Sequence, residues 1–238
     1  MTDNGIKDKI QYGTKEIEYT VHRSQRKTLE ISVEPDTSVS VVAPLEAPAA
    51  AIRHKIKKRS RWIIRQQIYF TDFLPLMPKK EYVSGESFYY LGRQHRLKVI
   101  EAQKASIQII DKRLVVEISN KSNRAKIQKL VENWYLAEAI PYFSNRLEKL
   151  WPQFSKDDRP PTLSVRKMPK RWGSYTRSGK IILNVELIQA PSHCIDYVIV
   201  HELCHVFHRD HSPNFFELLE RIMPDWKIRK EKLEKIHL

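Results

Sequence analysis

The sequence has 238 residues but only two cysteines, Cys194 and Cys204, and it has no long hydrophobic run. Two cysteines cannot form a disulfide framework, which makes a reducing compartment the expected location. No segment approaches the roughly 18 apolar residues that a membrane-spanning helix needs. The first ten residues, MTDNGIKDKI, lack the apolar stretch of a signal peptide. These absences predict a cytoplasmic protein with no membrane partner.

Acidic residues are also few, because 28 Asp and Glu stand against 42 Lys and Arg, which gives a net charge of +14. The surplus is divided evenly between residues 1–120 and 121–238, so the chain has no basic tail. Two windows, 47–71 and 160–185, contain no acidic residue at all. Their basic residues are Arg53, Lys55, Lys57, Lys58, Arg59, Arg61 and Arg65, and then Arg166, Lys167, Lys170, Arg171, Arg177 and Lys180. Such a surplus predicts attraction to nucleic acid, anionic membrane or acidic substrates.

The first half has the pattern of a mainly β region with one helix. Apolar and polar residues alternate over 15–43, which predicts an antiparallel meander with one solvated face. Residues 48–70 carry apolar side chains at helical spacing among cations, which predicts an amphipathic helix with a basic outer face. Short apolar runs between 81 and 118 predict further strands.

The polar segment 119–123 is the predicted boundary between an N-terminal region, 1–120, and a second domain, 121–238. Helical spacing of apolar residues over 124–154 predicts a long helix that Pro141 kinks or divides. No internal repeat is visible along the chain.

The second half ends in a hairpin and two helices. Residues 162–188 predict a hairpin, in which Ile181–Glu186 forms an edge strand. Residues 193–208 are apolar nearly all round, which is typical of a helix buried in the middle of a domain. Ser212 followed by Pro213 predicts the start of a last helix.

The predicted buried helix contains the motif H-E-x-x-H at His201, Glu202 and His205. A spacing of four residues places both imidazoles on one helical face, one turn apart, where they can converge on one cation. Glu202 lies about 100° round the helix, close enough to approach a metal-bound water without becoming a ligand. Neutral imidazoles suit zinc, which acidifies its water so that Glu202 can take the proton. The motif therefore predicts a zinc-dependent hydrolase with Glu202 as general base.

A third ligand must come from beyond this helix. His208 lies about 10 Å of axial rise from His201, which is too far for both to bind one zinc. His211 follows the helix end, where the chain reverses, and it is the expected ligand. Glu217 or Glu220 from the next helix is the carboxylate alternative.

The segments RWGSYTRSGKIILNVELIQAP and IDYVIVHELCHVFHRDHSPNFF resemble the YgjP-like metallopeptidases, relatives of the WLM and SprT-type zinc proteases. The stretch YTVHRSQRKTLEISVEPDTSVSVVAP is similar to the leading β segment of that family, so the resemblance covers nearly the whole chain. It implies zinc bound by His201, His205 and His211, with Glu202 as general base. The family commonly has Cys where this chain has Tyr175.

The expected fold class is α+β. A zincin-like catalytic domain, with the H-E-x-x-H helix and a small antiparallel sheet, is preceded by the mainly β N-terminal region with one helix. The resemblance implies that the hairpin before the motif borders the cleft, where its edge strand can pair with an extended peptide. Asn184 is expected to hold substrate or to support the site, and Arg171 and Tyr175 to stabilise an oxyanion.

Three functions are compatible with these features. The first is a zinc metallopeptidase acting on a protein or peptide substrate that is acidic or bound to nucleic acid. The second is a metal-dependent hydrolase of a nucleotide phosphoanhydride, such as a nucleoside triphosphate pyrophosphatase, which the window 160–185 favours. The third is a nucleic-acid-binding protein with an auxiliary metal, although no RNA-recognition, zinc-ribbon or helix-turn-helix signal is present. Histidine-rich coordination favours zinc over carboxylate-held Mg²⁺, so the peptidase is expected.

Overall fold

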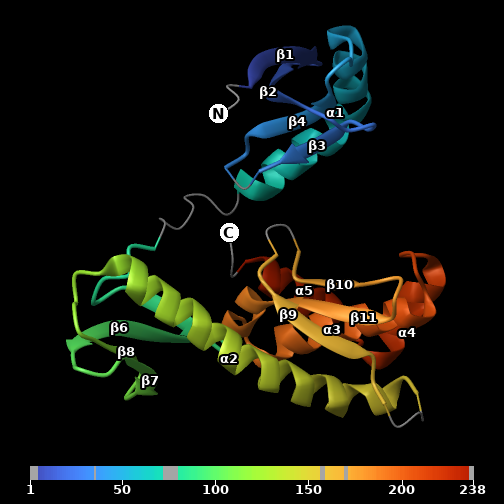
Figure 1. Cartoon of the computed structure of the whole chain (residues 1–238). Helices are drawn as coiled ribbons and strands as arrows, with labels where there is room; N and C mark the ends of the chain where they lie inside the picture. Colours follow the sequence, from blue (N-terminus) through green and yellow to red (C-terminus); the bar gives the residue numbers. More distant parts are fainter. Residues whose placement is uncertain (1–4, 35, 72–79, 156–158, 169–170, 236–238) are drawn as a thin grey trace. The chain divides into compact units, whose positions relative to one another are not determined.

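The computed structural model describes residues 5–34, 36–71, 80–155, 159–168 and 171–235. The chain divides into two compact units, Met1–Pro78 and Lys79–His237 (Figure 1). The division lies well before the boundary that the polar segment 119–123 predicts. The physical reason is that strand residues such as Leu114 and Val116 are buried in the hydrophobic core of the second unit.

The first unit is a four-stranded sheet with one helix on it. The strands are β1 (Ile6–Tyr12), β2 (Lys15–Ser24), β3 (Glu30–Val33) and β4 (Val39–Pro44), and the helix is α1 (Ala49–Thr71). Their order in the sheet is β1-β2-β4-β3. The pairs β1–β2 and β3–β4 are antiparallel, whereas β2 and β4 are parallel. The predicted antiparallel meander is therefore wrong in its central pairing.

The core of the first unit forms between one face of this sheet and one face of α1. Alternate residues of β2, such as Ile17 and Tyr19, are buried on that face together with Val41 of β4. Ile56 and Ile63 of α1 complete the core. Because β2 alternates with period two and α1 has an apolar stripe at helical spacing, the two patterns meet at one interface.

The second unit begins with the same arrangement. Its strands are β5 (Ser87–Tyr90), β6 (Arg93–Glu101), β7 (Ser106–Ile110) and β8 (Arg113–Ile118), in the order β5-β6-β8-β7, followed by helix α2 (Arg124–Leu150). Again the outer pairs are antiparallel and the central pair, β6–β8, is parallel. The fold thus contains a repeated module of four strands and a helix, although the sequence shows no repeat. We call the copies module 1 (β1–α1) and module 2 (β5–α2).

Helix α2 joins module 2 to the rest of its unit. It continues unbroken through the exposed Pro141, so the predicted division of this helix is wrong. Its buried residues recur mostly every fourth position, at Ile127, Val131, Tyr135, Ala139, Phe143, Leu147 and Leu150. Such a stripe turns by about 40° per step. The helix therefore contacts β7 and β8 and also elements further along the chain (Figure 1).

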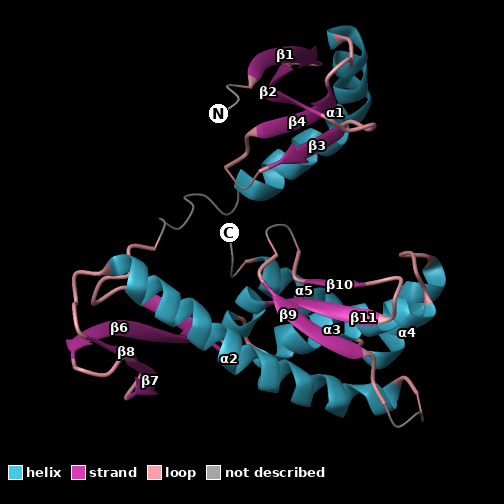
Figure 2. Cartoon of the chain, in the orientation of Figure 1, coloured by secondary structure: helices cyan, strands magenta, loops and turns pink. Residues whose placement is uncertain are grey.

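The remaining elements are one buried helix, α3, and the shorter elements around it (Figure 2). They are η1 (Trp151–Gln153), β9 (Thr162–Arg166), β10 (Gly173–Tyr175), β11 (Lys180–Asn184), η2 (Val185–Gln189), α3 (Ser192–Phe207), α4 (Pro213–Ile222) and α5 (Trp226–Glu234). The sheet order is β10-β11-β9, with β10–β11 antiparallel and β11–β9 parallel. The α+β class is confirmed, but the small sheet is mixed. β11 is its central strand, so Ile181–Glu186 does not form the predicted edge.

The turn between β5 and β6 is hydrogen-bonded to η2 and so links module 2 to the rest of its unit. The backbone N–H of Leu91 donates to the carbonyl of Ile188, and that of Gly92 donates to the carbonyl of Gln189. Gly92 has φ +78°, and a Cβ there would lie 2.7 Å from the Pro191 ring, so both its conformation and its contact require glycine. Among the described residues, no helix combines the length and apolar character needed to cross a membrane.

Candidate active site

Helix α3 is the buried element on which the site is built. Its residues from Cys194 to Val200 are buried on all sides, as the sequence predicts. One acidic side chain, Asp196, is buried with them and receives two hydrogen bonds from the Arg146 guanidinium of α2, at 2.7 and 2.6 Å. This bidentate ion pair fixes α3 against α2, because a buried carboxylate needs such a partner.

Three histidines meet at the C-terminal end of α3. His201 and His205 lie one turn apart on the helix, and His211 comes from the segment between α3 and α4. One ring nitrogen of each lies within 4.8 Å of the others. The Nε2 atoms of His201 and His211 are 3.1 Å apart. The structure therefore brings together the three residues predicted as metal ligands.

The arrangement fits a divalent metal ion. Zn–N bonds of about 2.1 Å at a tetrahedral angle set two nitrogens about 3.4 Å apart, close to the observed separation of the two Nε2 atoms. The Nδ1 of His205 lies 3.0 Å from the carbonyl oxygen of His208, which leaves its Nε2 to bind a metal. Burial, followed by the nearby His205 and His211, lowers the pKa of His201 to about 3. His201 is therefore neutral at neutral pH, which is the form that ligates a metal.

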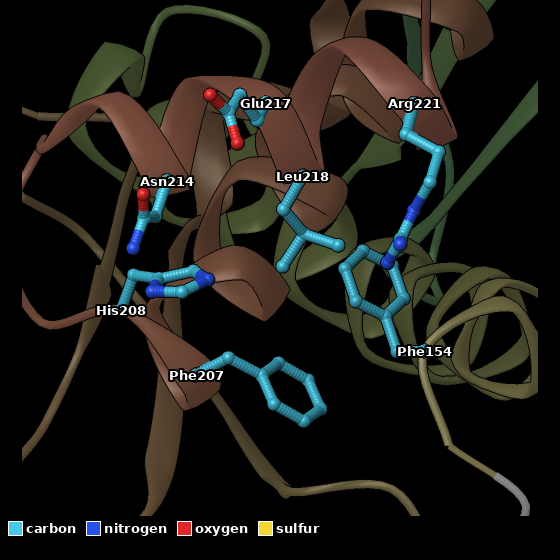
Figure 3. A pocket seen from close by; sticks show the side chains of 7 residues that line it. All are labelled: Phe154, Phe207, His208, Asn214, Glu217, Leu218 and Arg221. Carbon is cyan, nitrogen blue, oxygen red and sulfur yellow. The ribbon is translucent and has the colours of Figure 1, made fainter.

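The other candidate ligands lie elsewhere. His208 and Glu217 line a hollow of about 730 Å³ between the end of α3 and the outer face of α4 (Figure 3). Glu220 accepts a hydrogen bond from the indole N–H of Trp226 and lies 3.9 Å from Lys227 Nζ. His208 thus serves the site through its backbone carbonyl.

Phe215 lies beneath the three imidazoles. It is the third residue of α4 and is fully buried. Its ring centroid is 5.0 Å from that of His201 and 4.7 Å from those of His205 and His211. The ring forms an apolar floor that restricts how the imidazoles turn. Nothing in the spacing of Phe215 along the sequence indicates this contact with the imidazoles.

Glu202 lies beside strand β10. Its side chain is only 5% exposed, and its carboxylate accepts a hydrogen bond from the backbone N–H of Tyr175. A Cβ at Gly173 would lie 2.5 Å from Glu202 Oε1, so only glycine leaves room for the carboxylate. Burial raises the pKa of Glu202 to about 7, although the Tyr175 N–H and the charge of Arg171 oppose the shift.

The three residues expected to contact substrate differ in their placement. Arg171 is exposed and close enough to influence Glu202, whereas the Tyr175 hydroxyl lies near Gly179, at the hairpin turn. Asn184 is 3% exposed. Its side-chain amide bonds the backbone of Met168, Arg171 and Glu186, so it supports the segment that leads into β10.

The free edge next to Glu202 belongs to β10, which pairs with β11 alone among the strands of the described residues. The predicted hairpin 162–188 contains this strand, but sequence reasoning missed that β10 forms the edge and that Gly173 and the Tyr175 N–H contact Glu202. The glycine of the W-G-S sequence was the one available signal. Lys170, part of the basic window before the motif, lies outside the described residues.

The α+β fold, the histidines of α3 and its following segment, and a strand edge beside Glu202 define a zincin-like metallopeptidase domain. A family model described as "YgjP-like, metallopeptidase domain" matches residues 27–236. The chain therefore belongs to the YgjP-like metallopeptidase family, as the resemblance predicted.

Two solved structures are similar to part of the chain. The metallopeptidase zymogen abylysin of Pyrococcus abyssi is 21% identical, with a TM-score of 0.35, over 38% of this chain and 90% of that one. The metallopeptidase zymogen jannalysin of Methanocaldococcus jannaschii is 14% identical, with a TM-score of 0.35, over 39% of this chain and 94% of that one. No curated protein matches the chain in sequence.

Proposed function

We propose that the protein is a zinc-dependent peptidase in which His201, His205 and His211 hold the metal and Glu202 is the general base. The observation that carries the proposal is the convergence of three ring nitrogens within 4.8 Å next to a buried carboxylate held by a backbone N–H. A divalent ion bound there supplies Lewis acidity that polarises a carbonyl and lowers the pKa of water.

Zinc is the ion that this donor set favours. Three imidazoles with one position left open are typical of catalytic zinc, whereas Mg²⁺ prefers oxygen ligands and phosphate partners. Glu217 lines the hollow beyond the end of α3 and Glu220 accepts a hydrogen bond from Trp226, and neither carboxylate belongs to the histidine cluster. The histidine site therefore favours peptide hydrolysis over hydrolysis of a nucleotide phosphoanhydride.

Glu202 moves the proton. Its carboxylate takes a proton from the attacking water and delivers it to the leaving amine. Gly173 and the Tyr175 N–H fix its position, so that little reorganisation is needed when substrate binds. Phe215 keeps the imidazoles in place during this step.

Strand β10 positions the substrate. Its free edge offers backbone N–H and carbonyl groups to an extended peptide, which would add a further strand beside Glu202. Arg171, exposed at the start of this segment, favours a substrate with acidic residues. The two cysteines are both free and buried, in keeping with action in a reducing cytoplasm.

The test compares wild type, Glu202→Gln and Glu217→Gln, each loaded with zinc. The substrates are an unstructured acidic protein and a set of nucleoside triphosphates. We expect Glu202→Gln to keep its zinc, measured by mass spectrometry of the metal, and to cleave the protein about 10²- to 10⁴-fold more slowly. Glu217→Gln should resemble wild type. Unchanged cleavage by Glu202→Gln, or hydrolysis of triphosphates alone, would refute the proposal.

A further inference from the structure

The outer face of α1 in module 1 carries a cluster of cations around one aromatic ring. Lys58, Arg59, Arg61, Trp62 and Arg65 line one shallow hollow on this helix. We call these five residues the basic face. Lys58, Arg61, Trp62 and Arg65 follow the spacing i, i+3, i+4 and i+7, so they share one side of the helix. Trp62 is 37% exposed in their midst.

The charges of the basic face have no acidic partners in the part of the chain that the structure describes. Arg53, one turn earlier, pairs with Asp8 at 2.9 Å, but no ion pair is found for the four cations of the basic face among the described residues. Arg61 and Arg65 are like charges four residues apart, and their repulsion destabilises the helix. A polyanion bound to this face would remove that repulsion.

The repeated module shows that this face is not a requirement of the fold. In module 2 the corresponding helix, α2, contacts its own sheet and also β9, η2 and α3. Its apolar stripe is accordingly longer and passes from one set of contacts to the other. In module 1 the helix uses one face for its sheet and carries cations on the opposite face. The same scaffold therefore has a different surface in each copy.

We propose that the basic face of α1 binds single-stranded nucleic acid. The cations neutralise backbone phosphates, while the exposed indole of Trp62 offers a surface on which a base stacks. An acidic peptide would use the cations but would gain little from an exposed indole between them. This site lies in the first unit, whereas the three histidines lie in the second, so its binding needs neither the metal nor Glu202.

The first experiment measures binding of the full chain to a fluorescent oligothymidine of about 20 nucleotides, by fluorescence anisotropy at several salt concentrations. With about four phosphates neutralised, log K should fall with a slope near −3 against log salt, or about 50-fold between about 50 and 200 mM. The triple variant Lys58→Gln/Arg61→Gln/Arg65→Gln should lose most of the affinity and reduce the slope by about 2.

A matched control removes the same charge elsewhere. Lys98, Lys104 and Arg113 are exposed residues of module 2, and their joint substitution by Gln lowers the net charge equally. This control should bind as wild type does. If it weakens binding as much as the α1 triple does, the attraction comes from net charge alone and the proposal is wrong.

The second experiment tests the ring. Trp62→Leu should weaken oligothymidine binding about tenfold, and Trp62→Phe should restore most of it, because stacking needs an aromatic face. Far-UV circular dichroism verifies that both variants keep α1. Poly-glutamate of matched charge should compete weakly. Equal binding by Trp62→Leu and wild type, or competition by poly-glutamate as strong as by unlabelled oligothymidine, would assign the face to acidic protein and overturn the proposal.

Discussion

Gly173→Ala is the most direct test of how Glu202 is positioned. Gly173 does not have a positive φ, so alanine costs nothing in backbone conformation. The added Cβ would nevertheless lie 2.5 Å from Glu202 Oε1, 2.7 Å from Cγ and 2.9 Å from Cδ. Ordinary contact distances of about 3.5 Å then require the side chain or β10 to move by about 1 Å. The hydrogen bond from the Tyr175 N–H is lost or lengthened in either case.

A displacement of this size is expected to reduce kcat about 10²-fold, because the general base no longer meets the attacking water. Zinc content should stay unchanged, since the three atoms nearest to an added Cβ at Gly173 all belong to Glu202. The assay is cleavage of an unstructured protein at saturating zinc, with kcat and KM determined separately. Ser174→Ala, at the next position of β10, is the control and should retain wild-type kcat.

A double variant decides whether Gly173 acts through Glu202. If it does, Gly173→Ala/Glu202→Gln should be no slower than Glu202→Gln alone, because the group that Gly173 positions has already been removed. Additive losses in the double variant would show that Gly173 acts by another route. A Gly173→Ala variant with wild-type kcat would contradict the whole account of the Glu202 environment.

Three further predictions concern metal binding and stability. At zinc about 100-fold above its Kd, the ion should stabilise wild type by about 2.7 kcal/mol, which is measured as a rise in Tm. His211→Ala should lose this rise in Tm. His208→Ala should keep it, because only the backbone carbonyl of His208 contacts the site. Asp196→Asn should lower the free energy of unfolding in urea by about 2 kcal/mol, because it leaves Arg146 without its bidentate partner; no change would mean that the ion pair is redundant. Hydrogen bonds from Arg53 and then from Tyr19 hold the pKa of Asp8 below its usual range. Ionised Asp8 therefore stabilises the first unit at pH values above its unfolded pKa of about 3.9, and this contribution is lost as the pH falls. Hydrogen exchange of β1 should therefore be faster in Asp8→Asn than in wild type at pH 7, with a difference that shrinks below about pH 4.

The convergence of the three histidines could be foreseen from the sequence because most of its geometry is local. His201 and His205 are one helical turn apart, so their common direction follows from helix geometry. His211 comes next along the chain, after a segment too short to carry it far from the helix end. The buried character of α3 was equally visible in its apolar residues.

The surroundings of Glu202 could not be foreseen, because they depend on contacts between segments far apart in sequence. Gly173 precedes Glu202 by many residues, and only the pairing of β10 with β11 brings the two together. The same limitation explains the wrong edge strand, since strand alternation predicts strands but not their neighbours. Asn184 is a second example of this limitation. Its side chain is buried and bonds the backbone of Met168 and Arg171, which are distant in sequence, so this supporting role is not visible in the sequence.

Comparison of the two modules explains why the charge of a segment alone does not predict the role of its surface. Both modules share strand order and the parallel central pair, yet no sequence repeat is visible. A sheet with one covering helix needs apolar residues on only one side of that helix, so the opposite side is free to diverge. In α2 additional apolar residues contact α3, and this packing supports the helix that carries the histidines. In α1 it is used by the basic face, around Trp62. The basic window of residues 47–71 thus belongs to a surface of module 1, whereas Arg171 of the later window acts directly on the electrostatics of Glu202.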